Sequence, residues 1–237
     1  MLEVCVDTID GANAALKGGA SRVELCSSLS EGGLTPSAGL MRLAATLPIP
    51  CYAMIRPRCG LFQYSQKEID IMICDIAVAR DAGLAGVVLG VQSSDGSLDL
   101  DVLKRLIDEA GSLGKTLHRV IDVAPDPLRA LEQAIELGFD RVLTSGARPL
   151  APDGMSLIRQ MVDLANQRLS VMPGCGLIPE NVRRVLDATG ATEAHASCRL
   201  KVCGEPAFSD FDPPNGRWET SQEEVARMVA AIVREPL

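Results

Sequence analysis

The stretch Gly19-Ala20-Ser21-Arg22-Val23-Glu24-Leu25-Cys26 places a glycine three residues ahead of a short run of alternating side chains. The same arrangement recurs at Gly83, Gly138 and Gly190. A period of two is typical of a β-strand, because its successive side chains point to opposite faces. A glycine just ahead of a strand is typical of the end of a preceding helix. The recurrence therefore predicts a repeated unit in which a helix leads into a strand.

Working outward from this stretch, the chain contains eight candidate strands separated by helical patterns. Their starts lie 20 to 36 residues apart, enough for a strand, a helix and two short loops: Leu2, Arg22, Pro50, Gly86, Lys115, Arg141, Leu169 and Glu193. Ser65 with Glu68, and Ser221 with Glu224, each form a capping-box pattern ahead of an apolar stripe. We therefore expect an α/β fold, a single-domain (β/α)8 TIM barrel over residues 1–237. The barrel should occupy about 1–200, and the tail and final helix should form a short C-terminal extension over 201–237.

The four strands that follow these glycines separate into an outer and an inner face when they are aligned. The outer set should pack against the helices: Val23, Leu25, Val87, Leu89, Val142, Thr144, Ala194 and Ala196. The inner set is more polar: Glu24, Cys26, Val88, Gly90, Leu143, Ser145, His195 and Ser197. Polar side chains are thus expected inside the barrel near the strand C-termini, where barrel enzymes carry their chemistry.

The charge and apolar composition of the chain limit the kinds of partner that the protein can bind. The chain has 23 Lys and Arg against 31 Asp and Glu, a formal net charge of −8. This balance argues against a nucleic-acid binder, although a pocket can still be locally basic. No run of 18 apolar residues occurs, and Glu3 and Asp7 interrupt the apolar start. We expect a cytoplasmic protein that binds no membrane, and a homo-oligomer is compatible with the sequence.

Ionisable side chains at the expected strand ends form a candidate acid/base site. The set comprises Glu3, Glu24, Arg56, His118, Asp122 and His195. His118 is the preferred general acid/base because histidine titrates near neutral pH, and Arg56 could orient an anionic group. This pattern predicts an enzyme, or a non-catalytic binder, for a small anionic or phosphorylated metabolite. The alternative is an internal salt-bridge network that stabilises the barrel.

Glycine turns after the last three strands form a candidate phosphate site. The residues are Ser145, Gly146, Gly174, Gly176 and Ser197. Backbone N–H groups in such turns commonly bind phosphate in this fold. Glycine turns that only connect strand to helix are the alternative.

Several segments in order resemble the CutC family, historically called copper homeostasis proteins. They include 2–7 (LEVCVD), 22–26 (RVELC), 31–37 (EGGLTPS), 54–58 (MIRPR), 143–146 (LTSG) and 195–197 (HAS). The resemblance extends to about Arg199 and implies a (β/α)8 barrel with a role in copper handling. Two departures stand out: Leu61 replaces an acidic residue of the family pattern, and Cys175 is inserted in the turn after the seventh strand.

The eight cysteines form no C-x-x-C pair, and reduced thiols are expected. The alternation places Cys5 and Cys26 on the inner face of adjacent parallel strands, which lie about 5 Å apart. Cu(I) is soft and prefers thiolate ligands, so these two residues are the candidate copper ligands, as the resemblance also implies. A pair of small core residues is the alternative.

Overall fold

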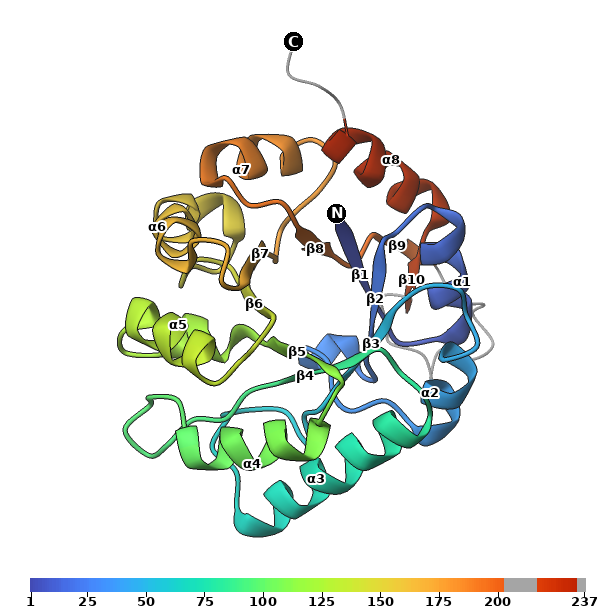
Figure 1. Cartoon of the computed structure of the whole chain (residues 1–237). Helices are drawn as coiled ribbons and strands as arrows, with labels where there is room; N and C mark the ends of the chain where they lie inside the picture. Colours follow the sequence, from blue (N-terminus) through green and yellow to red (C-terminus); the bar gives the residue numbers. More distant parts are fainter. Residues whose placement is uncertain (203–216, 234–237) are drawn as a thin grey trace.

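A ring of parallel strands forms the centre of the computed structural model, which describes residues 1–202 and 217–233 (Figure 1). Eight strands form one sheet: β1 (Leu2–Val6), β2 (Arg22–Leu25), β3 (Cys51–Met54), β4 (Gly86–Leu89), β5 (Gly114–Leu117), β6 (Arg141–Thr144), β7 (Ser170–Pro173) and β8 (Ala194–Ala196). β1 pairs with both β2 and β8, and a parallel bridge between Gly174 and His195 joins β7 to β8. The predicted (β/α)8 barrel is confirmed, and each strand begins within one residue of its predicted start.

A helix follows each strand and covers the outside of the ring. The helices are α1 (Ile9–Lys17), α2 (Ala38–Ala44), α3 (Gln66–Asp81), α4 (Leu100–Ala110), α5 (Pro127–Glu136), α6 (Met155–Ala165), α7 (Val182–Thr189) and α8 (Gln222–Val233). Short 3-10 turns lie at Leu29–Glu31, Arg119–Val123 and Ala151–Asp153. Ser65 and Glu68 form the predicted capping box of α3, and the Ser221 hydroxyl accepts from the Glu224 N–H at the start of α8. Across the described ranges, no helix is long and apolar enough to span a membrane.

The chain between β8 and α8 forms a small hairpin outside the ring. Its strands are β9 (Arg199–Val202) and β10 (Arg217–Thr220), which pair antiparallel. α8 then lies between α7 and α1 and takes the eighth place around the barrel (Figure 1). Within the extension expected over 201–237, residues 203–216, with Cys203, and residues 234–237 lie outside the described residues.

The two faces of the strands separate as the alternation predicts. Val4, Val23, Leu25 and Val87 belong to the apolar core between strands and helices. Cys26, Met54 and Val88 form a separate small cluster inside the barrel. Most of the barrel interior is therefore available to polar groups.

A closed ionic layer fills the bottom of the barrel; we call it the lower network and define it as Glu3, Arg22, Arg141 and Glu193. Arg22 is ion-paired with Glu3 and lies 2.6 Å from Glu193, and Arg141 lies 2.7 Å from Glu193. Both guanidinium groups lie over the Tyr52 ring. The strand glycines Gly86 and Gly114 make room for this ring, since a Cβ on either would lie about 2 Å from Tyr52 atoms. These four charged groups compensate one another in a layer with little exposure to solvent.

Candidate functional site

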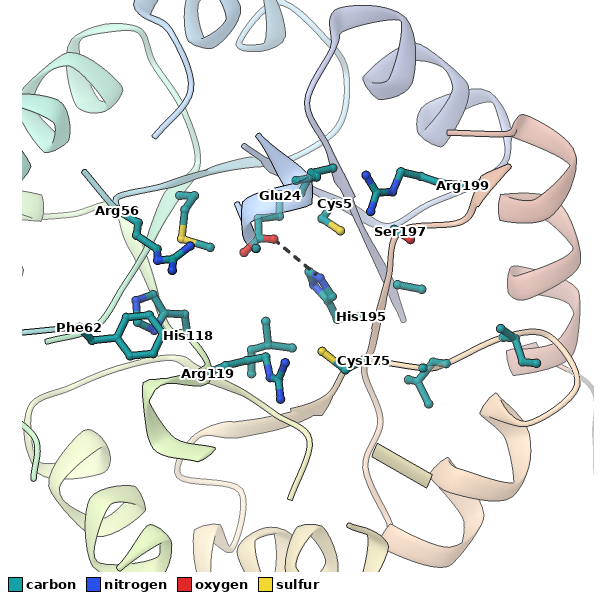
Figure 2. Close-up of a pocket in the computed structure, with 18 residues that line it drawn as sticks. Cys5, Glu24, Arg56, Phe62, His118, Arg119, Cys175, His195, Ser197 and Arg199 are labelled. Atoms are coloured by element: carbon teal, nitrogen blue, oxygen red, sulfur yellow. Dashed lines mark ion pairs between the residues drawn. The ribbon is translucent and has the colours of Figure 1, made fainter. Parts of the chain in front are cut away.

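A cavity of about 490 Å³ opens at the C-terminal ends of the strands (Figure 2). It lies directly above the lower network and is lined by side chains from most strand ends and from β9. The polar and sulfur-containing lining residues are Cys5, Glu24, Met54, Arg56, His118, Arg119, Cys175, His195, Ser197 and Arg199. Cavities of this size usually hold small ligands.

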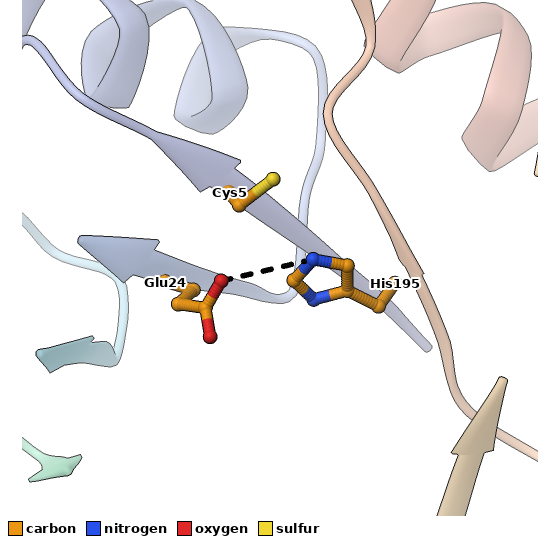
Figure 3. A group of neighbouring side chains, drawn as sticks. All are labelled: Cys5, Glu24 and His195. Atoms are coloured by element: carbon orange, nitrogen blue, oxygen red, sulfur yellow. Dashed lines mark ion pairs between the residues drawn. The ribbon is translucent and has the colours of Figure 1, made fainter. Parts of the chain in front are cut away.

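Three residues on one side of the cavity form a compact cluster with three kinds of donor atom (Figure 3). A sulfur, a carboxylate oxygen and an imidazole nitrogen of Cys5, Glu24 and His195 all lie within 4.8 Å of one another. The strand register explains this grouping, because Cys5 of β1 lies opposite Glu24 of β2 and Glu3 opposite His195 of β8. All three residues are buried, so the cluster is capable of holding a metal ion.

Glu3 lies beneath this cluster and orients the imidazole. Nδ1 of His195 lies 2.8 Å from Glu3 Oε1, while Nε2 lies 3.7 Å from Glu24 Oε2. A carboxylate that accepts from Nδ1–H leaves Nε2 directed at the other two donors. Glu3 itself does not line the cavity and also belongs to the lower network.

The neighbouring charges determine the protonation of this region. Burial raises the pKa of Glu24 to about 7, although His195 opposes the rise. Burial alone would raise the pKa of Glu3, but hydrogen bonding to His195 and the charge of Arg22 lower it to about 2. Burial also acts to lower the pKa of His195, yet Cys5, Glu24 and Glu3 together raise it well above its usual value. The Glu3–His195 pair is therefore ionised at neutral pH.

The second predicted copper ligand, Cys26, lies behind Glu24 and does not line the cavity. Its thiol is fully buried and donates to Glu24 Oε2 at 3.7 Å. Burial and the Glu24 carboxylate raise the pKa of this thiol well above its usual value. The Cys5–Cys26 ligand pair stays a prediction, and the register places Glu24, not Cys26, opposite Cys5.

The opposite wall of the cavity carries Arg56, Phe62 and His118. Nη1 of Arg56 donates to the carbonyls of Glu31 and Gly33 at 2.8 and 3.0 Å, so the guanidinium clamps the loop after β2. Its Nε is buried with no partner among the described residues. The arginine also lies over the Phe62 ring.

His118 is held as a neutral imidazole. Its Nδ1 accepts from the Val120 N–H at 3.1 Å, which leaves the proton on Nε2, a buried atom without a partner in the described chain. Burial and the Arg56 charge lower the pKa of His118 to about 3. This low pKa keeps the imidazole neutral at pH 7, with its Nε2–H available to donate a hydrogen bond. The acid/base role of His118 stays a prediction.

Asp122 lies outside the cavity and occupies the turn after β6. Its carboxylate accepts from the backbone N–H groups of Ser145 and Ala147 at 3.0 to 3.1 Å and from the Thr144 hydroxyl at 2.6 Å. The Gly146 N–H donates to Thr144 Oγ1. The donors predicted for phosphate at Ser145 and Gly146 are thus engaged by the protein itself.

The loops after β7 and β8 contribute the remaining predicted residues. Gly174 closes the ring against His195 and does not line the cavity, whereas Gly176 and Ser197 do. Our sequence reasoning missed Arg199, although it continues the inward alternation of His195 and Ser197. Figure 2 shows its guanidinium directed toward the cavity, and its buried Nε lacks a partner within the described ranges.

Comparison with known proteins identifies the family. A CutC family model matches residues 1–201. A family protein CutC of Caulobacter vibrioides is 48% identical over 237 residues, covering 98% of this chain and 96% of that protein. The copper homeostasis protein cutC homolog of Homo sapiens is 44% identical over 200 residues, covering 84% of this chain and 73% of the human protein. The crystal structure of CutC from Streptococcus agalactiae is 32% identical and superposes with a TM-score of 0.80, covering 83% of this chain and 98% of that one. The chain therefore belongs to the CutC family.

Proposed function

We propose that this protein binds a copper ion as cargo on the floor of its cavity, with Cys5 and His195 as the principal ligands. The observation that supports this function is the Cys5–Glu24–His195 cluster, whose donor atoms lie within 4.8 Å of one another. The human relative is named a copper homeostasis protein, which agrees in kind with this cargo. We expect a cytoplasmic protein.

The donor set suits copper better than a hard cation. Thiolate sulfur selects Cu(I), and imidazole nitrogen is also a good copper ligand. Glu3 fixes the His195 ring from below, so Nε2 can bind without reorientation once it has lost its proton. The Glu24 carboxylate would compensate the positive charge of the ion, and Cys26 would supply a second sulfur if Glu24 moved aside.

Copper binding is tested by anaerobic competition for Cu(I) against a chromophoric chelator. We expect one ion per chain, with affinity at least about 100-fold weaker in Cys5→Ser and in the Cys5→Ser, Cys26→Ser double variant. The exposed thiol of Cys74 provides the matched control, and Cys74→Ser should bind as the parent does. Unchanged affinity in the double variant would exclude this site.

A second candidate function is the binding or conversion of a small anionic metabolite. Arg56, Arg119 and Arg199 line the cavity with only one carboxylate, that of Glu24, among the lining residues. An acceptor-rich anion would satisfy the unpartnered donors of His118 and Arg199. The net charge of −8 therefore does not describe the cavity.

A thermal-shift screen of phosphorylated and carboxylated metabolites tests this candidate in the metal-free protein. A ligand of the cavity should raise Tm in the parent, and the shift should be lost in Arg199→Ala. Arg159, in an exposed pair with Asp163 on α6, provides the control variant Arg159→Ala. A screen in which no such anion raises Tm would argue against this function.

A further inference from the structure

We propose that Cys175 supplies a second sulfur ligand to the copper ion, from the wall of the cavity that faces Cys5. This inference rests on the proposed copper function and assigns a ligand beyond the Cys5–Cys26 pair. Cys175 follows β7 in the turn Pro173-Gly174-Cys175-Gly176 and lines the same cavity as the Cys5–Glu24–His195 cluster.

The side chain of Cys175 is directed into the cavity. Figure 2 shows the sulfur atoms of Cys5 and Cys175 both pointing into the cavity, with the His195 ring between them in this view. Cys175 is half-buried, whereas Cys26 is fully buried behind Glu24. An ion entering the cavity therefore meets the Cys175 thiol before it can approach Cys26.

The backbone holds the thiol in place at an energetic cost. Cys175 has φ of +73°, in the left-handed region where a residue other than glycine is strained. Its carbonyl accepts from the Ala151 N–H at 2.9 Å, so the turn is anchored. A glycine would adopt this conformation without strain, and the cost of a thiol here is offset if the sulfur binds a ligand.

Binding is a ligand exchange without redox change. Cu(I) leaves the chelator that delivers it. The thiols of Cys5 and Cys175 and the Nε2–H of the His195 imidazolium each lose a proton to solvent as the two copper–sulfur bonds and the copper–nitrogen bond form. Copper remains Cu(I) throughout. Cys175 lies outside the group of atoms within 4.8 Å of one another, so its side chain rotates toward the ion on binding.

The test compares Cys175→Gly, Cys26→Ala, Cys5→Ser and Cys74→Ser in the anaerobic Cu(I) competition. Glycine fits the left-handed backbone, so Cys175→Gly should fold. We expect its affinity for Cu(I) to fall at least about tenfold, and X-ray absorption to report one copper–sulfur bond in place of two.

Wild-type affinity and two sulfur ligands in Cys175→Gly, with binding lost in Cys5→Ser, would overturn this inference and leave the proposed function intact. Loss of the second sulfur in Cys26→Ala would overturn it as well. Wild-type affinity in Cys5→Ser would instead refute the proposed function.

Alkylation provides a readout that does not depend on affinity. Iodoacetamide should modify the exposed Cys59 and Cys74 with or without copper, and these thiols calibrate the reaction. Modification of Cys175, mapped by peptide mass, should be suppressed when one equivalent of Cu(I) is bound. Equal modification of Cys175 in the loaded and metal-free protein would contradict the proposed ligand.

Discussion

The lower network and the cavity are neighbouring layers of the same barrel, and they treat charge in opposite ways. In the lower network, Arg22 and Arg141 are ion-paired with Glu3 and Glu193. In the cavity, three arginines line a space that contains one carboxylate. Of the five buried side-chain atoms without a partner in the described chain, four belong to cavity-lining residues and none to the lower network. The lower network is saturated, because its charged groups pair with one another, and it serves stability. The cavity is unsaturated, because buried polar atoms there lack partners, and it is suited to binding a ligand.

The largest expected effect comes from breaking the saturated layer. Arg22→Met removes the cation that joins Glu3 to Glu193 and leaves their buried charges less compensated. We expect the free energy of unfolding to fall by about 3–5 kcal/mol, measured by urea denaturation at pH 7. Arg159→Ala, which removes an exposed ion pair on α6, should cost less than about 1 kcal/mol. Similar losses in the two variants would mean that the lower network does not stabilise the barrel.

A smaller effect should appear in the pH dependence of the unsaturated layer. Burial and Arg56 lower the folded pKa of His118 to about 3, so between that value and about 6.5 the unfolded chain binds a proton that the folded chain does not. The stability contributed by neutral His118 is therefore complete above pH 6.5 and is lost as pH falls toward 3, by about 3 kcal/mol between pH 7 and pH 4. In His118→Gln, the fall in unfolding free energy from pH 7 to pH 4 should be shallower than in the parent. Parallel curves would refute a buried, neutral His118.

The smallest effect separates ligand binding from stability at Cys175. Because its φ of +73° suits glycine, Cys175→Gly should raise the free energy of unfolding of the metal-free protein by about 1 kcal/mol. Ala147, on the turn after β6, has φ of +54° and gives a matched test without a thiol. Ala147→Gly should stabilise similarly and leave Cu(I) affinity unchanged. Destabilisation by Cys175→Gly would show that packing of the thiol outweighs the strain.

Much of the barrel follows from local sequence. Alternation of period two separated Val23 and Leu25, which pack outward, from Glu24, which points inward. The repeated glycines marked the ends of helices correctly, since Gly19 and Gly138 both have φ above +80°. These signals are local, because they depend on backbone conformation and on which face of a strand is apolar.

The site is harder to predict because it depends on relative positions of strands and loops. The alternation of side chains predicts that Cys5 and Cys26 both lie on the inner face of the barrel. Only the register of β1 on β2 shows that Cys5 lies opposite Glu24. Asp122 carries no sequence signal that it fills the turn after β6. The role of Cys175 depends on a left-handed residue between two glycines, which the sequence does not distinguish from an ordinary loop thiol.

Closure of the ring has a consequence for synthesis of the protein. The Glu3–His195 hydrogen bond joins positions 192 residues apart, and β1 has no partner on that side until β8 has been translated. Translation proceeds at about 5–20 residues per second, so the backbone groups on this edge of β1 stay unpaired for on the order of ten seconds or more. The nascent chain should therefore benefit from a chaperone that shields β1. Cys5 and Glu24 are made early, but the cluster with His195, and with it the proposed copper site, is complete only after this final step.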